Sequence, residues 1–203
     1  MIDLDDLLRE LSPEAPSGEN LEYEATSNYG ALERAAQGKP EQQFGDTLIP
    51  AEEPEWGTVQ RLALELFGST RDLRVAALLT RALTRTAGWP GFRDGLLLIE
   101  GLINRFWATV HPQLDPDDDN DPTFRVNTIA SLNDAAATLD GLRDAVLVEA
   151  RGIGRFSLRD LQIANGELPA PKNAETGPPE PQMMAAAFQE GDLEQLRAVS
   201  KAI

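Results

Sequence analysis

The stretch that decides the fold runs from Leu73 to Val110, LRVAALLTRALTRTAGWPGFRDGLLLIEGLINRFWATV. Its apolar residues recur every three or four positions on both sides of Gly88-Trp89-Pro90-Gly91, which is the spacing of one helix face. Glycine and proline mark turns, so these four residues predict a turn between two helices. We expect one helix from about residue 70 to 87, with Ser69 as its N-cap, and a second from 92 to 110. The second helix should be the most buried element, around which the others pack.

The same spacing predicts shorter helices on either side of this pair. Asp121 before Pro122 is typical of a helix start, because the carboxylate accepts from free amides and proline lacks only an N–H that would be unpaired there. The segment 38–54 has no period and predicts a long surface loop. The expected helices are 4–11, 27–37 and 56–67 before the pair, and 122–139 after it.

Glycines also place a small β-structure in the chain. Arg151-Gly152-Ile153-Gly154 lies between two short apolar runs, which predicts a β-hairpin over residues 146–158. A helical turn or two should follow and end at Gly166. The expected fold class is therefore mainly α, a compact bundle of four to five helices with this hairpin and a short helical tail.

The composition changes sharply near the C-terminal end. Prolines at five positions between 169 and 181 predict an extended linker. We therefore divide the chain into a domain over 1–168, a Pro-rich linker over 169–181, and 182–203 as the start of a following helical region. The last segment is too small to own a core, which favours a chain cut from a longer one.

Charge and residue types restrict the function. The 203 residues include 34 acidic and 18 basic side chains, for a net charge of −16, and no cysteine. A disulfide scaffold and a Cys/His zinc site are excluded, and His-dependent catalysis would have to use His111, the single histidine. We expect no cofactor, and no nucleic-acid binding because the negative charge repels phosphate.

No segment resembles a targeting signal or a membrane span. The N-terminal MIDLDDLLREL lacks the basic region and unbroken apolar core of a signal peptide. The most apolar later stretch, residues 95–110, is interrupted by Glu100, Asn104 and Arg105. We expect a cytoplasmic protein without membrane insertion.

One loop suggests a metal site. The aspartates of the 115–121 segment alternate like the ligands of a calcium loop, but the sixth position from Asp115 is Asn120 instead of glycine, and the twelfth is Val126 instead of an acid. The loop therefore predicts a solvated turn that caps a helix. An enzyme that uses Asp115–Asp121 to bind a divalent metal remains the alternative.

Histidine and tryptophan could also serve a site. His111, expected in the last turn of a long helix before Pro112, is placed to contact the free carbonyls there. Trp56, Trp89 and Trp107 could stack on a ligand, yet two of them fall within helical apolar patterns, which favours packing in the core.

The order of these motifs resembles one family. The resemblance rests on a series of motifs. In chain order they are Leu8 to Leu21, Glu55-Trp56, Ser69 to Ala76, Gly88 to Phe92 with Gly95-Leu96, Phe106-Trp107, Val110-His111-Pro112, the acidic loop and Arg125-Val126-Asn127. Together they resemble the ImpA-related N-terminal domain, the shared N-terminal part of TssA-type proteins of the bacterial type VI secretion system. Arg71 stands where lysine is common, and Leu11 precedes Ser12-Pro13 where Pro-Ile is expected.

This resemblance implies a non-enzymatic assembly or adaptor protein that contacts baseplate, sheath, tube or membrane-complex components during tail biogenesis. It also implies that a C-terminal region outside these residues drives homo-oligomerisation. A free-standing capping or regulatory module of the same machine is the other alternative.

The resemblance further implies that the residues at the motif positions have structural roles. The protein would then act through a surface that binds other proteins. Arg125 should be tied to nearby acids. Candidate surfaces are the loop 38–54, the loop 115–121 and the outer faces of the helices. The positions expected to be structural are Trp56, Asp72, Trp107, His111, Asp115 and Arg125.

Overall fold

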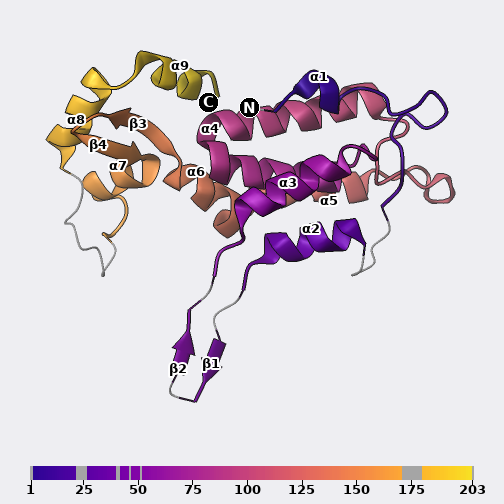
Figure 1. Cartoon of the computed structure of the whole chain (residues 1–203), viewed down its shortest axis with the longest axis horizontal. Coiled ribbons are helices and arrows are strands. Elements are labelled where there is room, and N and C mark those ends of the chain that lie inside the picture. The colour runs from indigo at the N-terminus through magenta and orange to yellow at the C-terminus, as the bar shows by residue number, and fades with distance from the viewer. Residues whose placement is uncertain are drawn as a thin grey trace.

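The computed structural model describes residues 2–21, 27–39, 42–45, 47–50, 52–170 and 180–202. These residues are mainly helical, with two small antiparallel two-stranded sheets. Two hydrophobic cores hold them. The larger core lies among α1 to α5, and the smaller lies among β3, β4, α7, α8 and α9 at the other end of the molecule (Figure 1).

Helix α4 (Leu73–Phe106) folds back on itself, as the sequence predicts. At Gly88 the backbone leaves the helix with φ 64° and ψ −145°, a conformation that glycine adopts without steric cost. The two arms then pass very close together, since a Cβ on Gly95 would lie 2.5 Å from Thr80 Oγ1. Glycine is therefore required both at the turn and at the crossing.

The first arm of α4, rather than the second, supplies more of the core. Residues 73–84 include nine buried positions, among them Leu73 and Leu79. The second arm ends at Phe106, four residues before the expected end, and exposes Leu96 and Leu97. Our prediction that the second helix is the most buried element is wrong, because its broad apolar face is not fully covered: Leu96 and Leu97 stay exposed, whereas the first arm buries most of its residues.

In the part of the chain that the structure describes, three helices precede α4; two lie where the spacing predicts, and the one expected over 4–11 ends at Leu7. They are α1 (Leu4–Leu7), α2 (Asn28–Gln37) and α3 (Trp56–Leu66). Leu32 of α2 and Val59 and Ala63 of α3 are fully buried in the larger core. Figure 1 shows α3 lying along α4, with α2 next to α3.

The predicted helix 122–139 is interrupted. Helix α5 (Thr123–Ala130) ends in a 3₁₀ turn at Ser131–Asn133, and a π-helical turn at Ala135–Leu139 leads into α6 (Asp140–Asp144). Asp134 causes the break, since its backbone is extended and its carboxylate accepts from the Ala137 amide at 2.7 Å. This side chain competes with the helical backbone for its donors.

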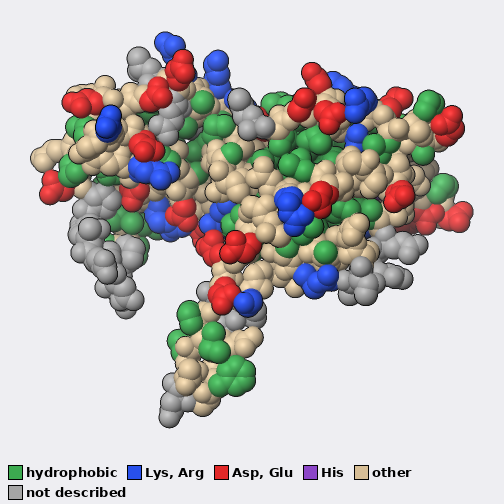
Figure 2. Space-filling view, viewed as in Figure 1, with side chains coloured by type: hydrophobic (Ala, Val, Ile, Leu, Met, Phe, Trp, Pro, Cys, Tyr) green, Lys and Arg blue, Asp and Glu red, His purple; other side chains and the backbone are tan. Residues whose placement is uncertain are grey.

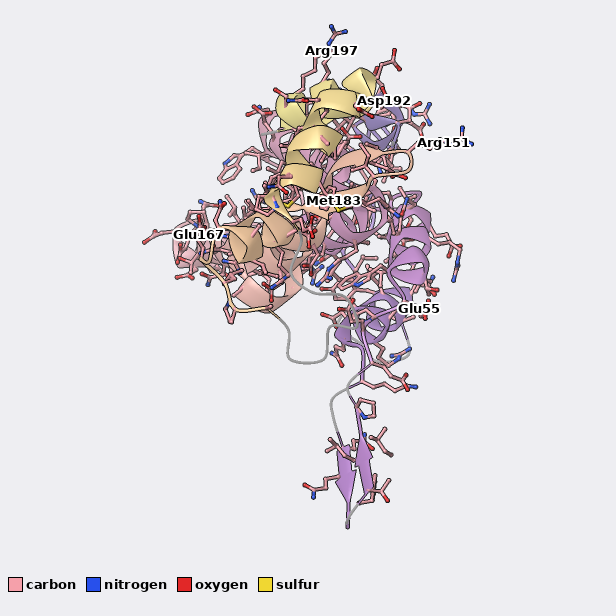
Figure 3. All side chains as sticks on the ribbon, turned by 90° about the vertical axis from the view of Figure 1, so that its left-hand side faces the viewer. Glu55, Arg151, Glu167, Met183, Asp192 and Arg197 are labelled. Carbon is pink, nitrogen blue, oxygen red and sulfur yellow. The ribbon has the colours of Figure 1, made fainter. Side chains whose placement is uncertain are left out.

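A second hairpin lies within the segment predicted as an irregular loop. Strands β1 (Gln42–Phe44) and β2 (Thr47–Ile49) pair antiparallel, with Phe44 opposite Thr47. The Lys39 and Glu52 backbones pair at the base of this hairpin, between the strands and the helices. The hairpin stands away from the helices in Figure 1 and again in Figure 3, which is turned by 90°.

The C-terminal part forms the smaller core. Strands β3 (Val146–Ala150) and β4 (Gly154–Ser157) make the predicted hairpin, and α7 (Leu158–Ala164) follows as expected. The expected short helical tail consists of α8 (Pro181–Glu190) and α9 (Leu193–Ala202), seen around Met183 and Asp192 in Figure 3. Most of the predicted linker, residues 171–179, lies outside the described residues. Val148, Phe156, Met184 and Ala187 are buried together, so α8 packs on the β3–β4 sheet.

None of the described helices is both long enough and apolar enough to cross a membrane.

Candidate functional site

Three of the expected motif residues, Asp72, His111 and Arg125, lie where the start of α4 meets the segment that follows its end. We call this cluster the polar junction; its members are Arg71, Asp72, Arg74, His111 and Arg125. Backbone hydrogen bonds join three chain segments there. Arg71 N donates to Ser17 O at 2.7 Å, His111 N to Arg71 O at 3.0 Å, and Leu73 N to His111 O at 2.8 Å. The junction therefore ties the N-terminal segment and the segment after α4 to the start of α4.

Asp72 is fully buried and caps α4. Its carboxylate accepts from the Arg74 amide at 2.7 Å and from the Arg74 guanidinium at 2.6 Å. Burial, the largest single effect, lowers the pKa of Arg74, but the hydrogen bonds and charge of Asp72, together with the nearby Tyr29 and Glu33, more than offset it and raise that pKa. The expected N-cap, Ser69, donates to Leu66 O instead, so the prediction that Ser69 opens this helix is wrong.

Arg71 holds the N-terminal segment through carbonyls. Its guanidinium donates to Arg9 O at 3.0 and 2.7 Å and also to Phe67 O. Burial lowers the pKa of this guanidinium. A planar group with five N–H donors suits several carbonyls at once, which a lysine at this position could not bind in the same way.

Arg125 reaches from α5 to the end of α4. It is 2% exposed and donates to Trp107 O, Val110 O and Pro112 O, each at 2.7 Å. Its guanidinium also lies 4.7 Å from the centre of the Trp107 ring. The prediction of acidic partners is wrong: in the described part of the chain this arginine satisfies carbonyls left free where the helix ends.

His111 also contacts a different partner from the one expected. Because α4 ends at Phe106, His111 lies beyond the helix and its Nε2 faces Gly18 O at 3.2 Å. A carbonyl only accepts, so Nε2 carries the proton in this contact. The prediction that His111 bonds the carbonyls of its own helix is therefore wrong.

The remaining motif aromatics lie outside the junction's buried centre. Trp56 is half-buried at the start of α3, with the Arg85 guanidinium 5.7 Å from its ring centre. Trp89 is half-buried and Trp107 is 45% exposed. Core packing is thus the wrong description of Trp107, which covers Arg125 on one side and faces water.

The acidic loop shapes its own backbone. Asp115 is exposed and accepts from the Asp117 amide at 2.9 Å. Asp121 accepts from the amide of Thr123 at 2.9 Å and from its hydroxyl at 2.7 Å, and the hydroxyl is the larger cause of a lowered Asp121 pKa. Asp121 thus assists the start of α5, although the N-cap position itself is Pro122. The described residues, this loop included, hold no group of three side chains arranged to bind a metal.

The β1–β2 hairpin, unlike the acidic loop, exposes large apolar side chains. Phe44, Leu48 and Ile49 are 66%, 58% and 42% exposed. The pairing of Gln42 with Ile49 and of Phe44 with Thr47 puts Phe44 and Ile49 on one face, and Leu48 on the other. Figure 2 shows these apolar side chains on the projection below the helices. This surface was not predicted from the sequence, although Gly45-Asp46 between short β-prone segments is a signal for a hairpin.

Comparisons with known proteins agree with the motif order. Residues 8–134 match the family described as ImpA, N-terminal, type VI secretion system. The chain is 43% identical over 204 residues to the type VI secretion system component TssA1 of Pseudomonas aeruginosa; the match covers 100% of this chain but 57% of that protein. The chain therefore spans little more than half the length of this relative.

A solved structure supports the same assignment. It is the N-terminal domain, including the conserved ImpA_N region, of the TssA component from Burkholderia cenocepacia. The TM-score is 0.70 at 28% identity, with 100% of this chain and 79% of that chain covered. The chain belongs to the ImpA N-terminal family of the type VI secretion system, as a TssA-type component.

Proposed function

We propose that this protein is a non-enzymatic assembly adaptor of the type VI secretion system, which contacts baseplate, sheath, tube or membrane-complex components while the tail is built. The observation that carries the proposal is the β1–β2 hairpin, with large apolar side chains exposed on both faces. A two-stranded hairpin is only marginally stable in water by itself, so a hairpin of this kind gains from a partner that covers it.

The use of the reactive side chains supports an adaptor over an enzyme. The carboxylate of Asp72 is engaged in capping α4, and the guanidinium groups of Arg71 and Arg125 are engaged in contacts that join chain segments. The family motif residues Trp56, Asp72, Trp107, His111, Asp115 and Arg125 are accordingly assigned structural roles. The binding surface is then provided by other residues, with the hairpin first among them.

The organisation of the chain is part of the proposal. We assign 1–168 to the ImpA N-terminal domain, 169–181 to a linker and 182–203 to the start of a following helical region. The family match over 8–134 supports the first assignment. Homo-oligomerisation is assigned to the additional region that the longer relative has beyond the part matched here.

Binding to purified components tests the adaptor function. The full-length protein is immobilised and offered sheath, baseplate, tube and membrane-complex proteins one at a time. We expect at least one to bind, and the variant Phe44→Ser/Leu48→Ser/Ile49→Ser to weaken that binding about tenfold or more. Leu96→Ser/Leu97→Ser, which alters exposed leucines on α4, is the matched control. Failure of every component to bind the full-length protein would contradict the proposal.

A metal titration tests the enzymatic alternative. Because Asp115 and Asp121 already accept hydrogen bonds from their own turns, millimolar calcium, magnesium or manganese should leave the Tm unchanged. A rise in Tm that disappears in Asp117→Asn/Asp119→Asn would favour a metal-dependent activity instead.

A further inference from the structure

The outer face of α5 carries no charge. Within Thr123–Ala130 the single charged residue is Arg125, and it is buried. Surface helices normally present charged side chains to water. This absence is unexpected in a chain in which 26% of the residues are charged. The exposed residues of this helix, which we call the α5 face, are Thr123, Phe124, Val126, Asn127 and Ala130.

Arg125 fixes the α5 face toward solvent. Its three hydrogen bonds to the carbonyls of Trp107, Val110 and Pro112 set the rotation of the helix about its axis. Phe124 and Val126, one residue before and one after Arg125, lie about 100° of helix rotation to either side of it and are 62% and 57% exposed. Thr123, Asn127 and Ala130 lie between them on the outward side. The α5 face is therefore preorganised, so a partner meets it without the entropic cost of ordering it.

An acidic loop adjoins this uncharged face. Residues 112–124 contain five exposed aspartates and no lysine or arginine. Asp121 connects the two features, since its amide donates to Asp118 O at 2.9 Å and its carboxylate accepts from Thr123 at the start of α5. The loop lies at the right-hand end of the molecule in Figure 1, and Figure 2 shows acidic side chains at that end. Its aspartates are Asp115, Asp117, Asp118, Asp119 and Asp121.

We propose that the α5 face and the acidic loop form a docking surface for a cationic amphipathic helix of a partner protein. That helix would lie along the row of Thr123, Asn127 and Ala130, with Ala130 allowing close approach. Its apolar side chains would contact Phe124 on one flank and Val126 on the other, and its lysines or arginines would face the aspartates. A second copy of this chain is a poor occupant, because its net charge of −16 opposes the loop. The partner's basic residues determine orientation, and its apolar residues supply most of the affinity.

This inference deepens the proposed function by stating the chemistry of one partner segment, and it concerns a surface different from the hairpin. The probe is a fluorescent peptide of about 18 residues, with leucine on one helix face and lysine on the other. Its anisotropy is measured with the 203-residue chain at about 50 and about 300 mM salt. A peptide of the same composition with scrambled helical spacing, and one with glutamate in place of lysine, are the comparison probes.

The helical cationic peptide should bind the wild-type chain more tightly than either comparison peptide. Phe124→Ser/Val126→Ser should raise its Kd about tenfold or more, while Leu96→Ser/Leu97→Ser leaves the Kd unchanged. Asp117→Asn/Asp118→Asn/Asp119→Asn should raise the Kd at low salt and reduce its salt dependence. Circular dichroism melts check that each variant folds, which is expected because every altered side chain is exposed.

Several results would overturn the inference. They are an unchanged Kd in Phe124→Ser/Val126→Ser, equal binding of the scrambled peptide, loss of peptide binding in the hairpin variant instead, or a dimer of the wild-type chain that this α5 variant converts to a monomer. Peptide binding that fails while a secretion component still binds the full-length protein rejects this surface but leaves the proposed function intact.

Discussion

The polar junction and the β1–β2 hairpin invert the usual distribution of side chains. In the junction, charged groups such as Arg125 and Asp72 are almost fully buried, whereas in the hairpin Phe44 and Leu48 are exposed. Buried charges persist because each has several hydrogen-bond partners within the chain. Exposed apolar side chains have no comparable role within the chain. The comparison separates residues that hold the fold from residues available to a partner.

The largest expected effect is on stability, in Arg125→Ala. The substitution leaves three carbonyls near the end of α4 without their donor, and it also removes the stacking on Trp107. We expect a loss of about 3–5 kcal/mol in the free energy of unfolding, measured by urea denaturation. Arg61→Ala, which breaks an exposed pair with Glu65, should cost no more than about 0.5 kcal/mol. Equal losses of stability in the two variants would contradict the claim that the buried charges of the polar junction hold the fold.

Asp72→Ala should have the next largest effect. It removes the N-cap of α4 and leaves the mostly buried Arg74 without its carboxylate, at a cost of about 2–4 kcal/mol. Asp72→Asn keeps an oxygen for the Arg74 amide and should lose about half as much. Asp3→Ala, which removes the exposed cap of α1, is the control and should cost less than about 1 kcal/mol. If Asp72→Asn were as damaging as Asp72→Ala, the charge rather than the cap would dominate.

A smaller, pH-dependent effect is expected at Asp140, a partly exposed acid outside both regions. Hydrogen bonds from Arg143 at 3.0 Å and Arg159 at 3.2 Å lower the pKa of its carboxyl group. A lowered folded-state pKa means that the stabilisation is present above the unfolded value of about 3.9 and is lost as pH falls through the folded value. Asp140→Asn should therefore cost up to about 1 kcal/mol at pH 7 and nothing near pH 2. Denaturation curves at both pH values measure this, and a cost that persists in acid would contradict it.

The smallest expected change in stability belongs to the hairpin. Phe44→Ser/Leu48→Ser/Ile49→Ser removes side chains that the larger core does not include, so the free energy of unfolding should change by less than about 0.5 kcal/mol. Thermal and urea denaturation of the 203-residue chain measure it. A loss as large as that of Asp72→Ala would show that these side chains support the fold. It would contradict the assignment of the hairpin to binding alone.

Helix positions were predictable because they depend on apolar spacing within one segment. The turn at Gly88 and the hairpin after Val146 follow from glycines at defined positions. The break at Asp134 was missed because the apolar spacing continues past it, although Asn133-Asp134 are residues that favour turns. Two three-residue strands are too short to show a period, so β1–β2 was missed as well.

The candidate site was predictable in part. Asp72 and Arg125 could be singled out by the motifs, but the partners of Arg125 could not, because its acceptors are backbone carbonyls that no side-chain pattern reveals. Exposure of Phe44 and Phe124 depends on which face the tertiary fold leaves open, and local sequence does not determine that.

Hydrogen–deuterium exchange on the chain bound to a purified secretion component tests the central claim most directly. We expect binding to slow exchange in residues 42–49, while the amides of Arg71, Leu73 and His111, already hydrogen-bonded in the junction, change little. A bound complex in which residues 42–49 exchange as fast as in the free chain would contradict the assignment of the hairpin as a contact surface.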